Sequence, residues 1–191
     1  MSEKTKSSAM KTSTPATSAR RIVVMGVAGC GKSTLGARLA EALALPFTEG
    51  DYLHSSESRA KMAAGIPLED ADRWPWLDRV VEALAREEEV IACSALKRVY
   101  RDRIRARAGG PVFFVHLSVP EGAITTRLKA RRGHYFDPAL QASQHAILEP
   151  LEADELGFGL DASRSVEEVL RRVLERLAQG LTDFPTTSST A

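Results

Sequence analysis

The sequence has little of what marks secreted, membrane-spanning or nucleic-acid-binding proteins. It contains two cysteines, Cys30 and Cys93, which show no paired spacing of the kind that holds zinc or builds a disulfide framework. No apolar run approaches the length of a membrane span, and no apolar signal segment follows the N-terminus. The formal net charge is +1, so no overall basic field recruits nucleic acid. We therefore expect a cytoplasmic protein with free thiols and with neither a membrane nor a nucleic acid as partner.

Low-complexity composition is confined to the two ends of the chain. Residues 1–19 are mainly Ser, Thr, Lys and Ala, which predicts a disordered tail, and residues 180–191 are again rich in Ser and Thr and predict a flexible one. The sequence shows no internal repeat, and its 191 residues suit one well-buried domain but not two. We predict a single domain over residues 20–179.

The domain is organised around the glycine-rich segment 26–33, which matches the phosphate-binding P-loop pattern G-x-x-x-x-G-K-[ST]. A β-branched apolar run, residues 22–25, precedes the segment and predicts a buried parallel strand. Leucines at positions 35, 39 and 43 recur every four residues and mark one face of a helix after it. Strand, glycine loop and helix are the context that this motif requires.

This arrangement aims backbone N–H groups and the positive end of a helix at an anion. We expect Lys32 to reach the β- and γ-phosphates of a nucleoside triphosphate, and the Ser33 hydroxyl to ligate Mg²⁺. The residues predicted to hold the nucleotide are Gly26, Val27, Ala28, Gly29, Cys30, Gly31, Lys32, Ser33 and Thr34.

Two carboxylates follow the second predicted strand, residues 46–48. Glu49 and Asp51 lie two positions apart and point in the same direction at the carboxyl edge of a parallel sheet, where open α/β folds bind ligands. Asp51 is a candidate to orient a substrate hydroxyl or accept its proton, and Glu49 is a candidate to help hold Mg²⁺ through water. The alternative is a solvated turn whose acids serve solubility.

The long segment between the second and third strands, about residues 52–76, is predicted to form a helical insertion that binds the phosphate acceptor. It contains Lys61 and Arg73, cations that suit an anionic substrate, although each is individually more often a surface charge. Asp72 is the predicted N-cap of the next helix, and Pro75 suits its first turn.

The third predicted strand, residues 90–93, ends without the aspartate that motor-type ATPases use for Mg²⁺. Metal binding is therefore left to Ser33 and to the acids after the second strand. A basic helical pattern follows, but no aromatic residues interleave with its arginines, which disfavours a nucleic-acid site. Within this pattern, Lys97 and Arg101 are spaced i and i+4 and are predicted to face a substrate together.

A second arginine-bearing helix lies further along the chain. Arg127 and Arg131 share one helical face, and Gly133 then breaks the pattern. An arginine-bearing helix that leads into a glycine hinge is typical of a lid, here predicted over about residues 131–148. Closure would bring guanidinium groups onto the transferred phosphoryl group and exclude water. The alternative is a pair of surface arginines.

Five βα-type units around a P-loop resemble the nucleoside-monophosphate-kinase-like fold, and the chain is similar to the gluconokinase family. The segments that carry the resemblance are Gly50-Asp51-Tyr52-Leu53-His54, Lys61-Met62, Gly65-Ile66-Pro67-Leu68, Asp72-Arg73, Pro75-Trp76-Leu77, Cys93-Ser94-Ala95-Leu96-Lys97, Tyr100-Arg101-Asp102, Leu128-Lys129-Ala130-Arg131, Gly133-His134, Ser143-Gln144 and Leu148-Glu149. They extend over residues 21–178 and are more specific together than the P-loop alone. His145 departs from the pattern, because an aromatic residue such as Phe is expected there.

The resemblance implies a three-layer α/β P-loop fold: a five-stranded parallel sheet with helices on both faces, an acceptor-binding insertion and an arginine-bearing lid. It implies phosphorylation of D-gluconate at the 6-hydroxyl by a homodimer, with ATP and Mg²⁺ as cofactors. The catalytic residues would be Lys32, Asp51, Arg127 and Arg131. The substrate would be bound by Asp51, His54, Lys61, Arg73, Lys97, Arg101 and His134, and the metal by Ser33 and Glu49.

Two alternatives stay open. A shikimate kinase or another small-hydroxyacid kinase would share the fold, although the pattern from Cys93 to Asp102 looks like gluconokinase. A nucleotide-dependent switch would hold ATP or GTP without a small-molecule acceptor. The chain lacks an N-K-x-D guanine-reading motif and carries the predicted acceptor lobe, which disfavours the switch.

Overall fold

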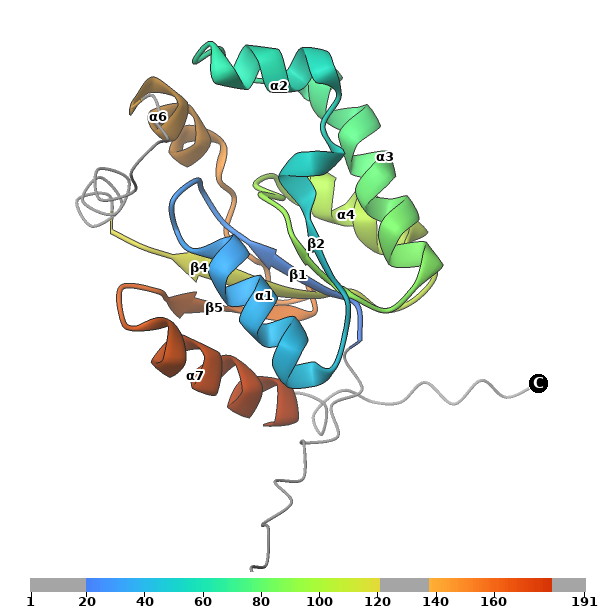
Figure 1. Ribbon diagram of the computed structural model, residues 1–191, viewed down its shortest axis with the longest axis vertical. Coiled ribbons are helices and arrows are strands. Elements are labelled where there is room, and N and C mark those ends of the chain that lie inside the picture. The colour runs from blue at the N-terminus through green and yellow to red at the C-terminus, as the bar shows by residue number, and fades with distance from the viewer. Residues whose placement is uncertain (1–19, 121–137, 180–191) are drawn as a thin grey trace, which may run out of the picture.

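The computed structural model describes residues 20–120 and 138–179, which form a parallel five-stranded sheet between two layers of helices (Figure 1). The sheet order is β2-β3-β1-β4-β5, and every neighbouring pair is parallel. The strands are β1 (Ile22–Met25), β2 (Phe47–Glu49), β3 (Val90–Ala92), β4 (Phe113–Ser118) and β5 (Gly157–Asp161). The predicted five-stranded parallel sheet is confirmed.

Helices cover both faces of the sheet, as the three-layer prediction requires. They are α1 (Lys32–Leu43), α2 (Ser56–Ala63), α3 (Asp70–Arg86), α4 (Arg98–Arg107), α6 (Pro138–Ile147) and α7 (Val166–Gln179), with a 3₁₀ turn, η1 (Gly50–Leu53). Helices α1 and α7 pack on one face, whereas α3 and α4 pack on the other (Figure 1). Apolar side chains of β1 alternate between the two layers: Ile22 and Val24 face α1, and Val23 and Met25 face α3. All four are fully buried, which explains the uninterrupted apolar run.

The insertion between β2 and β3 consists of η1, α2 and the first part of α3, as its length predicts. Helix α3 begins at Asp70, so the predictions that Asp72 is its N-cap and that Pro75 lies in its first turn are wrong. Asp72 occupies the third helical position, where its carboxylate accepts a hydrogen bond from the Glu69 N–H at 3.0 Å. This contact satisfies a backbone donor just before the helix and allows an earlier start.

The register of the sheet brings the ends of its strands to one edge. Glu49 at the end of β2 pairs with Ala92 at the end of β3, and Val24 of β1 pairs with the same residue. The loops after β1, β2 and β3 therefore leave the sheet together, which is where ligands bind in open α/β folds. Within residues 20–120 and 138–179, no helix is both long enough and apolar enough to cross a membrane.

Candidate active site

The P-loop joins β1 to α1 and depends on two glycines. Gly26 has φ 136°, and a Cβ there would lie 2.6 Å from the backbone oxygen of Leu117, so only glycine fits. Gly31 has φ 107° and immediately precedes α1, whose first turn holds no acidic residue. The first turn of α1 thus carries its partial positive charge without a neighbouring carboxylate, which suits an incoming phosphate.

Lys32 folds back over this loop. Its Nζ donates a hydrogen bond to the Val27 carbonyl oxygen at 3.0 Å. This hydrogen bond holds the ammonium against the loop whose motif binds phosphate. Ser33, the predicted Mg²⁺ ligand, is half-buried, and Thr34 is exposed at the rim.

The acids after β2 lie beside the P-loop lysine, around the thiol of Cys93. Burial raises the pKa of Cys93 to about 12; the charges of Asp51 and Glu49 also raise it, and that of Lys32 lowers it. Each of the three charged groups therefore lies within electrostatic range of this one thiol. Asp51 is exposed and Glu49 half-buried, so both carboxylates are accessible. Glu49, Asp51 and Lys32 thus gather at the end of β3.

The position of Asp51 is set by Trp76, one of the two tryptophans of α3. The Trp76 indole N–H donates to the Gly50 carbonyl oxygen at 2.7 Å, and its ring stacks on His54 with centroids 4.4 Å apart. A Cβ at Gly50 would lie 2.4 Å from the Ala92 oxygen and would clash with it. Only glycine therefore allows this turn to pack against β3. Trp76 is therefore a buried packing anchor, and it fixes the turn that carries Asp51.

His54 is buried and electrically neutral near physiological pH. Burial lowers the pKa of His54 to about 4; Asp51 opposes this shift, and the arginines at positions 59, 73 and 79 reinforce it. Its Nδ1 is buried without a hydrogen-bond partner. His54 can therefore offer a substrate a neutral ring and not a cation.

Three of the predicted substrate cations, Lys61, Arg73 and Lys97, lie along α2, α3 and the start of α4, each beside a carboxylate. Lys61 donates to Asp72 at 2.7 and 2.9 Å, and Lys97 donates to Asp70 at 2.8 and 2.9 Å. These hydrogen bonds lower the pKa of both carboxyl groups, so both are ionised at neutral pH. The result is a polar cluster with cations and carboxylates in alternation.

Arg73 completes this cluster through Tyr100. Its guanidinium donates to the Tyr100 hydroxyl at 3.2 Å and lies 3.7 Å from Asp70. The Tyr100 hydroxyl in turn donates to Asp70, and burial followed by this hydrogen bond raises the pKa of Tyr100. Sequence reasoning proposed the three cations but gave no role to Asp70 or Tyr100 and treated Asp72 only as a helix N-cap, because residue spacing does not reveal partners on other helices.

The structure contradicts the prediction that Arg101 faces a substrate with Lys97. Arg101 is fully buried and pairs with the buried Glu155 through two hydrogen bonds, at 2.6 and 2.8 Å. Its remaining donors bind the backbone oxygens of Ala95, Leu96, Glu149 and Pro150. Spacing i and i+4 placed it on the face of Lys97, but the chain after α6 covers it. Arg101 therefore anchors this segment and has no donor left for a substrate.

Three predicted residues, Arg127, Arg131 and His134, lie outside the described residues. Of the predicted lid, the described part is the segment from 138 onward, which includes α6. There the Gln144 side-chain oxygen accepts a hydrogen bond from the Ala28 N–H of the P-loop at 2.7 Å. In Figure 1, α6 lies beside the loop that joins β1 to α1.

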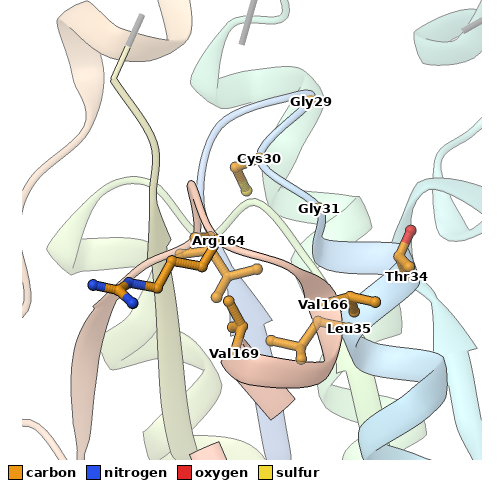
Figure 2. A pocket seen from close by; sticks show the side chains of 10 residues that line it. Gly29, Cys30, Gly31, Thr34, Leu35, Arg164, Val166 and Val169 are labelled. Atoms are coloured by element: carbon orange, nitrogen blue, oxygen red, sulfur yellow. The ribbon is translucent and has the colours of Figure 1, made fainter. Parts of the chain in front are cut away.

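A cavity of about 310 Å³ adjoins the P-loop (Figure 2). Gly29 and Gly31 form its roof, and Figure 2 shows the apolar side chains of Leu35, Val166 and Val169 below them. Thr34 and Arg164 stand at opposite sides of it. A mainly apolar cavity that continues from a phosphate-binding loop suits the non-phosphate part of a nucleotide. Sequence reasoning missed the contribution of Arg164 and α7, because no motif around them predicts that they lie next to the P-loop.

The donor set at the loop fits Mg²⁺. Among residues 20–120 and 138–179, no three His, Cys, Asp or Glu side chains are grouped to hold a metal. Mg²⁺ in kinases needs only one or two protein oxygens, because substrate phosphates and water complete its shell. The Ser33 hydroxyl at the head of α1 and the Glu49 carboxylate at the end of β2 are oxygens of this kind.

Known kinases match the chain over most of its length. A shikimate kinase family model matches residues 28–177. A Rattus norvegicus protein named "Probable gluconokinase" is 40% identical over 178 residues, which cover 82% of this chain and 96% of the relative. The thermoresistant gluconokinase of Escherichia coli (strain K12) is 38% identical over 165 residues, which cover 83% and 93% of the two chains.

A solved structure agrees with the sequence relatives. A gluconokinase from Sinorhizobium meliloti 1021 is 45% identical and matches with a TM-score of 0.77, covering 85% of this chain and 95% of that chain. Identity at this level over nearly whole chains extends well beyond the P-loop, which many unrelated activities share. The chain, with its P-loop, its β2 acids and its helical insertion, belongs to the gluconokinase family of small P-loop kinases.

Proposed function

We propose that the protein catalyses the ATP-dependent phosphorylation of D-gluconate at its 6-hydroxyl, which gives 6-phosphogluconate and ADP. One observation carries the proposal: a P-loop lysine and an exposed aspartate lie at one sheet edge, in a chain that is 45% identical to a solved gluconokinase. A phosphate donor site and a carboxylate for an attacking hydroxyl are the two halves of a small-molecule kinase.

The triphosphate would lie in the P-loop, with its base and ribose in the adjoining cavity. Backbone N–H groups within residues 26–34 that the protein itself leaves unpaired, together with the Lys32 ammonium, would bind the β- and γ-phosphates. Ser33 would hold Mg²⁺ directly and Glu49 through water, and the bound ion would neutralise charge that develops on the phosphates. The P-loop residues lie in the loop after β1 or in the first turn of α1, so the donor is held beside the central strand of the sheet.

The acceptor would lie between Asp51 and the cluster on α2, α3 and α4. Asp51 would orient the 6-hydroxyl and take its proton as the bond to phosphorus forms. Lys61, Arg73 and Lys97 would bind the substrate carboxylate, and His54 would act as a neutral hydrogen-bonding group. Asp70 and Asp72 interleave with these cations and are oxygen acceptors. A mixed set of donors and acceptors suits a chain of hydroxyl groups that ends in a carboxylate.

The remaining catalytic residues would come from the arginine-bearing helix. We propose that Arg127 and Arg131 neutralise the phosphoryl group in flight, as lid arginines do in phosphoryl transfer, and that His134 contacts the substrate. Their support is the resemblance of their sequence segment to the gluconokinase family.

The test is release of ADP from ATP and Mg²⁺ in the presence of D-gluconate, shikimate, glycerate or no acceptor. Turnover that depends on gluconate is the expected result. Turnover with shikimate or glycerate instead would keep the fold and overturn the substrate. ATP binding without turnover of any acceptor would favour the nucleotide-dependent switch.

We further propose a cytoplasmic homodimer whose kinase domain spans residues 20–179. The family resemblance supports the dimer, and free buried cysteines suit a reducing compartment. Sedimentation velocity of the full chain checks the assembly, because a monomer at micromolar concentration would contradict it.

A further inference from the structure

Gln144 lies at the P-loop and has no role in the mechanism so far. It sits on α6, and its side-chain oxygen accepts the Ala28 N–H at 2.7 Å across 116 residues of sequence. Ala28 belongs to the segment whose N–H groups face the phosphates. The side chain is half-buried, so it is partly ordered by its surroundings and partly accessible. A helix far away in sequence thus places an amide next to the phosphate site.

Elementary hydrogen-bond chemistry fixes how this amide is oriented. A backbone N–H only donates, so the atom that faces Ala28 must be the side-chain oxygen and not the NH₂ group. The NH₂ group is bonded to the same carbon and carries two further donors. The P-loop therefore uses the acceptor of Gln144, and the donors remain beside the same loop. Phosphate oxygens only accept when ionised, so they are matched by these donors.

The segment that follows α6 also helps to fix the position of Gln144. The Glu149 N–H donates to the Leu96 oxygen at 2.9 Å, and the oxygens of Glu149 and Pro150 accept hydrogen bonds from the buried Arg101. The helix is thus anchored on the segment that leads into α4, and its Gln144 rests on the P-loop. Donors that are held in place before the reaction stabilise developing charge most effectively.

We infer that Gln144 is a further phosphate-contacting residue of the transfer site. Its oxygen holds the Ala28 N–H, and its NH₂ group donates to the γ-phosphoryl group while that group passes to the acceptor. The inference rests on the proposed function, because it names a further contact in the same site. It makes α6 a contributor to catalysis as well as a support for the fold.

The test compares Gln144→Glu with Gln144→Ala. Glutamate keeps the length and an oxygen for the Ala28 N–H, but it removes the NH₂ donors and adds a negative charge beside the phosphates. We expect kcat to fall about 100- to 1,000-fold in Gln144→Glu, and by about 10- to 100-fold in Gln144→Ala, while KM for gluconate changes less than about threefold. The order of the two variants is the diagnostic result.

Two results would overturn the inference. If Gln144 only braces the loop, the kcat of Gln144→Glu stays at or above that of Gln144→Ala, because glutamate preserves the brace that alanine removes. If Gln144 only competes with phosphate for the Ala28 N–H, Gln144→Ala binds ATP more tightly and loses no kcat. Calorimetric titration with ADP and thermal unfolding of each variant show whether a loss of rate reflects binding or folding.

A matched control shows whether a loss of kcat depends on where the added negative charge lies or only on its presence in α6. Ala146→Glu adds the same charge to an exposed position of α6 and should retain wild-type kcat. Wild-type protein that turns over no gluconate would refute the proposed function by itself. The same ratios between the Gln144 variants would then be expected for the slow hydrolysis of ATP by water, and equal rates there would refute this inference.

Discussion

At the scale of a single residue, a substitution of Asp51 tests whether this carboxylate acts on the hydroxyl of the acceptor. It is exposed, and its turn is fixed by the hydrogen bond from Trp76 to Gly50. Asp51→Asn keeps the size of the side chain but can no longer take a proton. We expect kcat with gluconate to fall about 100- to 10,000-fold, with little change in nucleotide affinity. Steady-state kinetics and ADP titration measure the two effects, and an unchanged kcat would show that another group serves the hydroxyl.

His54 predicts how stability depends on pH. The pKa of His54 is about 4 in the folded protein and 6.5 ordinarily, mainly because of burial. Between these values the unfolded chain binds a proton that the folded chain does not. The stabilisation is therefore complete above pH 6.5 and is lost as pH falls towards 4, by up to roughly 3 kcal/mol in the free energy of unfolding.

The comparison with His54→Phe isolates this effect. Phenylalanine keeps the stacking on Trp76 and forfeits no hydrogen bond at Nδ1, which has no partner. Urea unfolding at several pH values between 4.5 and 7 should give a smaller slope for the variant. His116, whose pKa burial also lowers, contributes equally to both proteins and cancels. Equal slopes would mean that His54 is not held neutral by the fold.

His145 is a second histidine with a polar ring atom in surroundings that offer it no hydrogen bond. Its Nε2 is buried without a hydrogen-bond partner, at the position where the family resemblance leads one to expect phenylalanine. A buried polar atom without a partner costs about 1–3 kcal/mol. His145→Phe should therefore raise the free energy of unfolding by about 1 kcal/mol, which urea denaturation can measure. A loss of stability would show that the site cannot accommodate the larger ring.

At the scale of elements, the ion pair of Arg101 and Glu155 joins α4 to the segment between α6 and β5. Both side chains are fully buried; burial raises the pKa of Glu155, but hydrogen bonds from Arg101 outweigh it and the net pKa is lowered. Arg101→Leu leaves a buried carboxylate without its partner, which should cost about 3–5 kcal/mol of stability. The double variant Arg101→Leu/Glu155→Leu should regain part of this loss, because both charges are gone.

Unfolding by urea distinguishes this structural role from the predicted role in substrate binding. A substrate ligand would raise KM for gluconate at unchanged stability, whereas an anchor lowers the midpoint of unfolding first. Arg101→Leu with wild-type stability and a raised KM would restore the original prediction.

Elements also show where sequence reasoning succeeds. The P-loop, its strand and its helix were predictable because glycine positions and apolar periodicity are local properties. The start of α3 was missed because Glu69 and Asp72 are both residues that suit a helix N-terminus. Which of the two is the N-cap depends on the hydrogen bond from the Glu69 N–H to the Asp72 carboxylate. The partners of Lys61 and Lys97 were missed for a different reason. Both are carboxylates of α3, so the packing of helices against one another decides them.

At the scale of the whole molecule, the parallel sheet and the common edge of the site follow from the alternation of strands and helices. The contact between Gln144 and Ala28 does not follow from it, because no periodicity relates a side chain to a loop 116 residues away. The two described cores, by contrast, extend from Ile22 to Leu177 and include every buried strand. The bounds of the predicted domain, residues 20–179, remain a prediction.

A shortened chain of residues 20–179 tests this domain. Because the core residues from Ile22 to Leu177 are all retained, we expect its kcat for gluconate to stay within about twofold of the full chain. Its melting temperature should change by less than about 4 °C, the shift that corresponds to about 1 kcal/mol in a domain of this size. ADP release and calorimetry on both chains measure these quantities. A shortened chain that folds normally but loses kcat would assign a catalytic role to one of the removed ends.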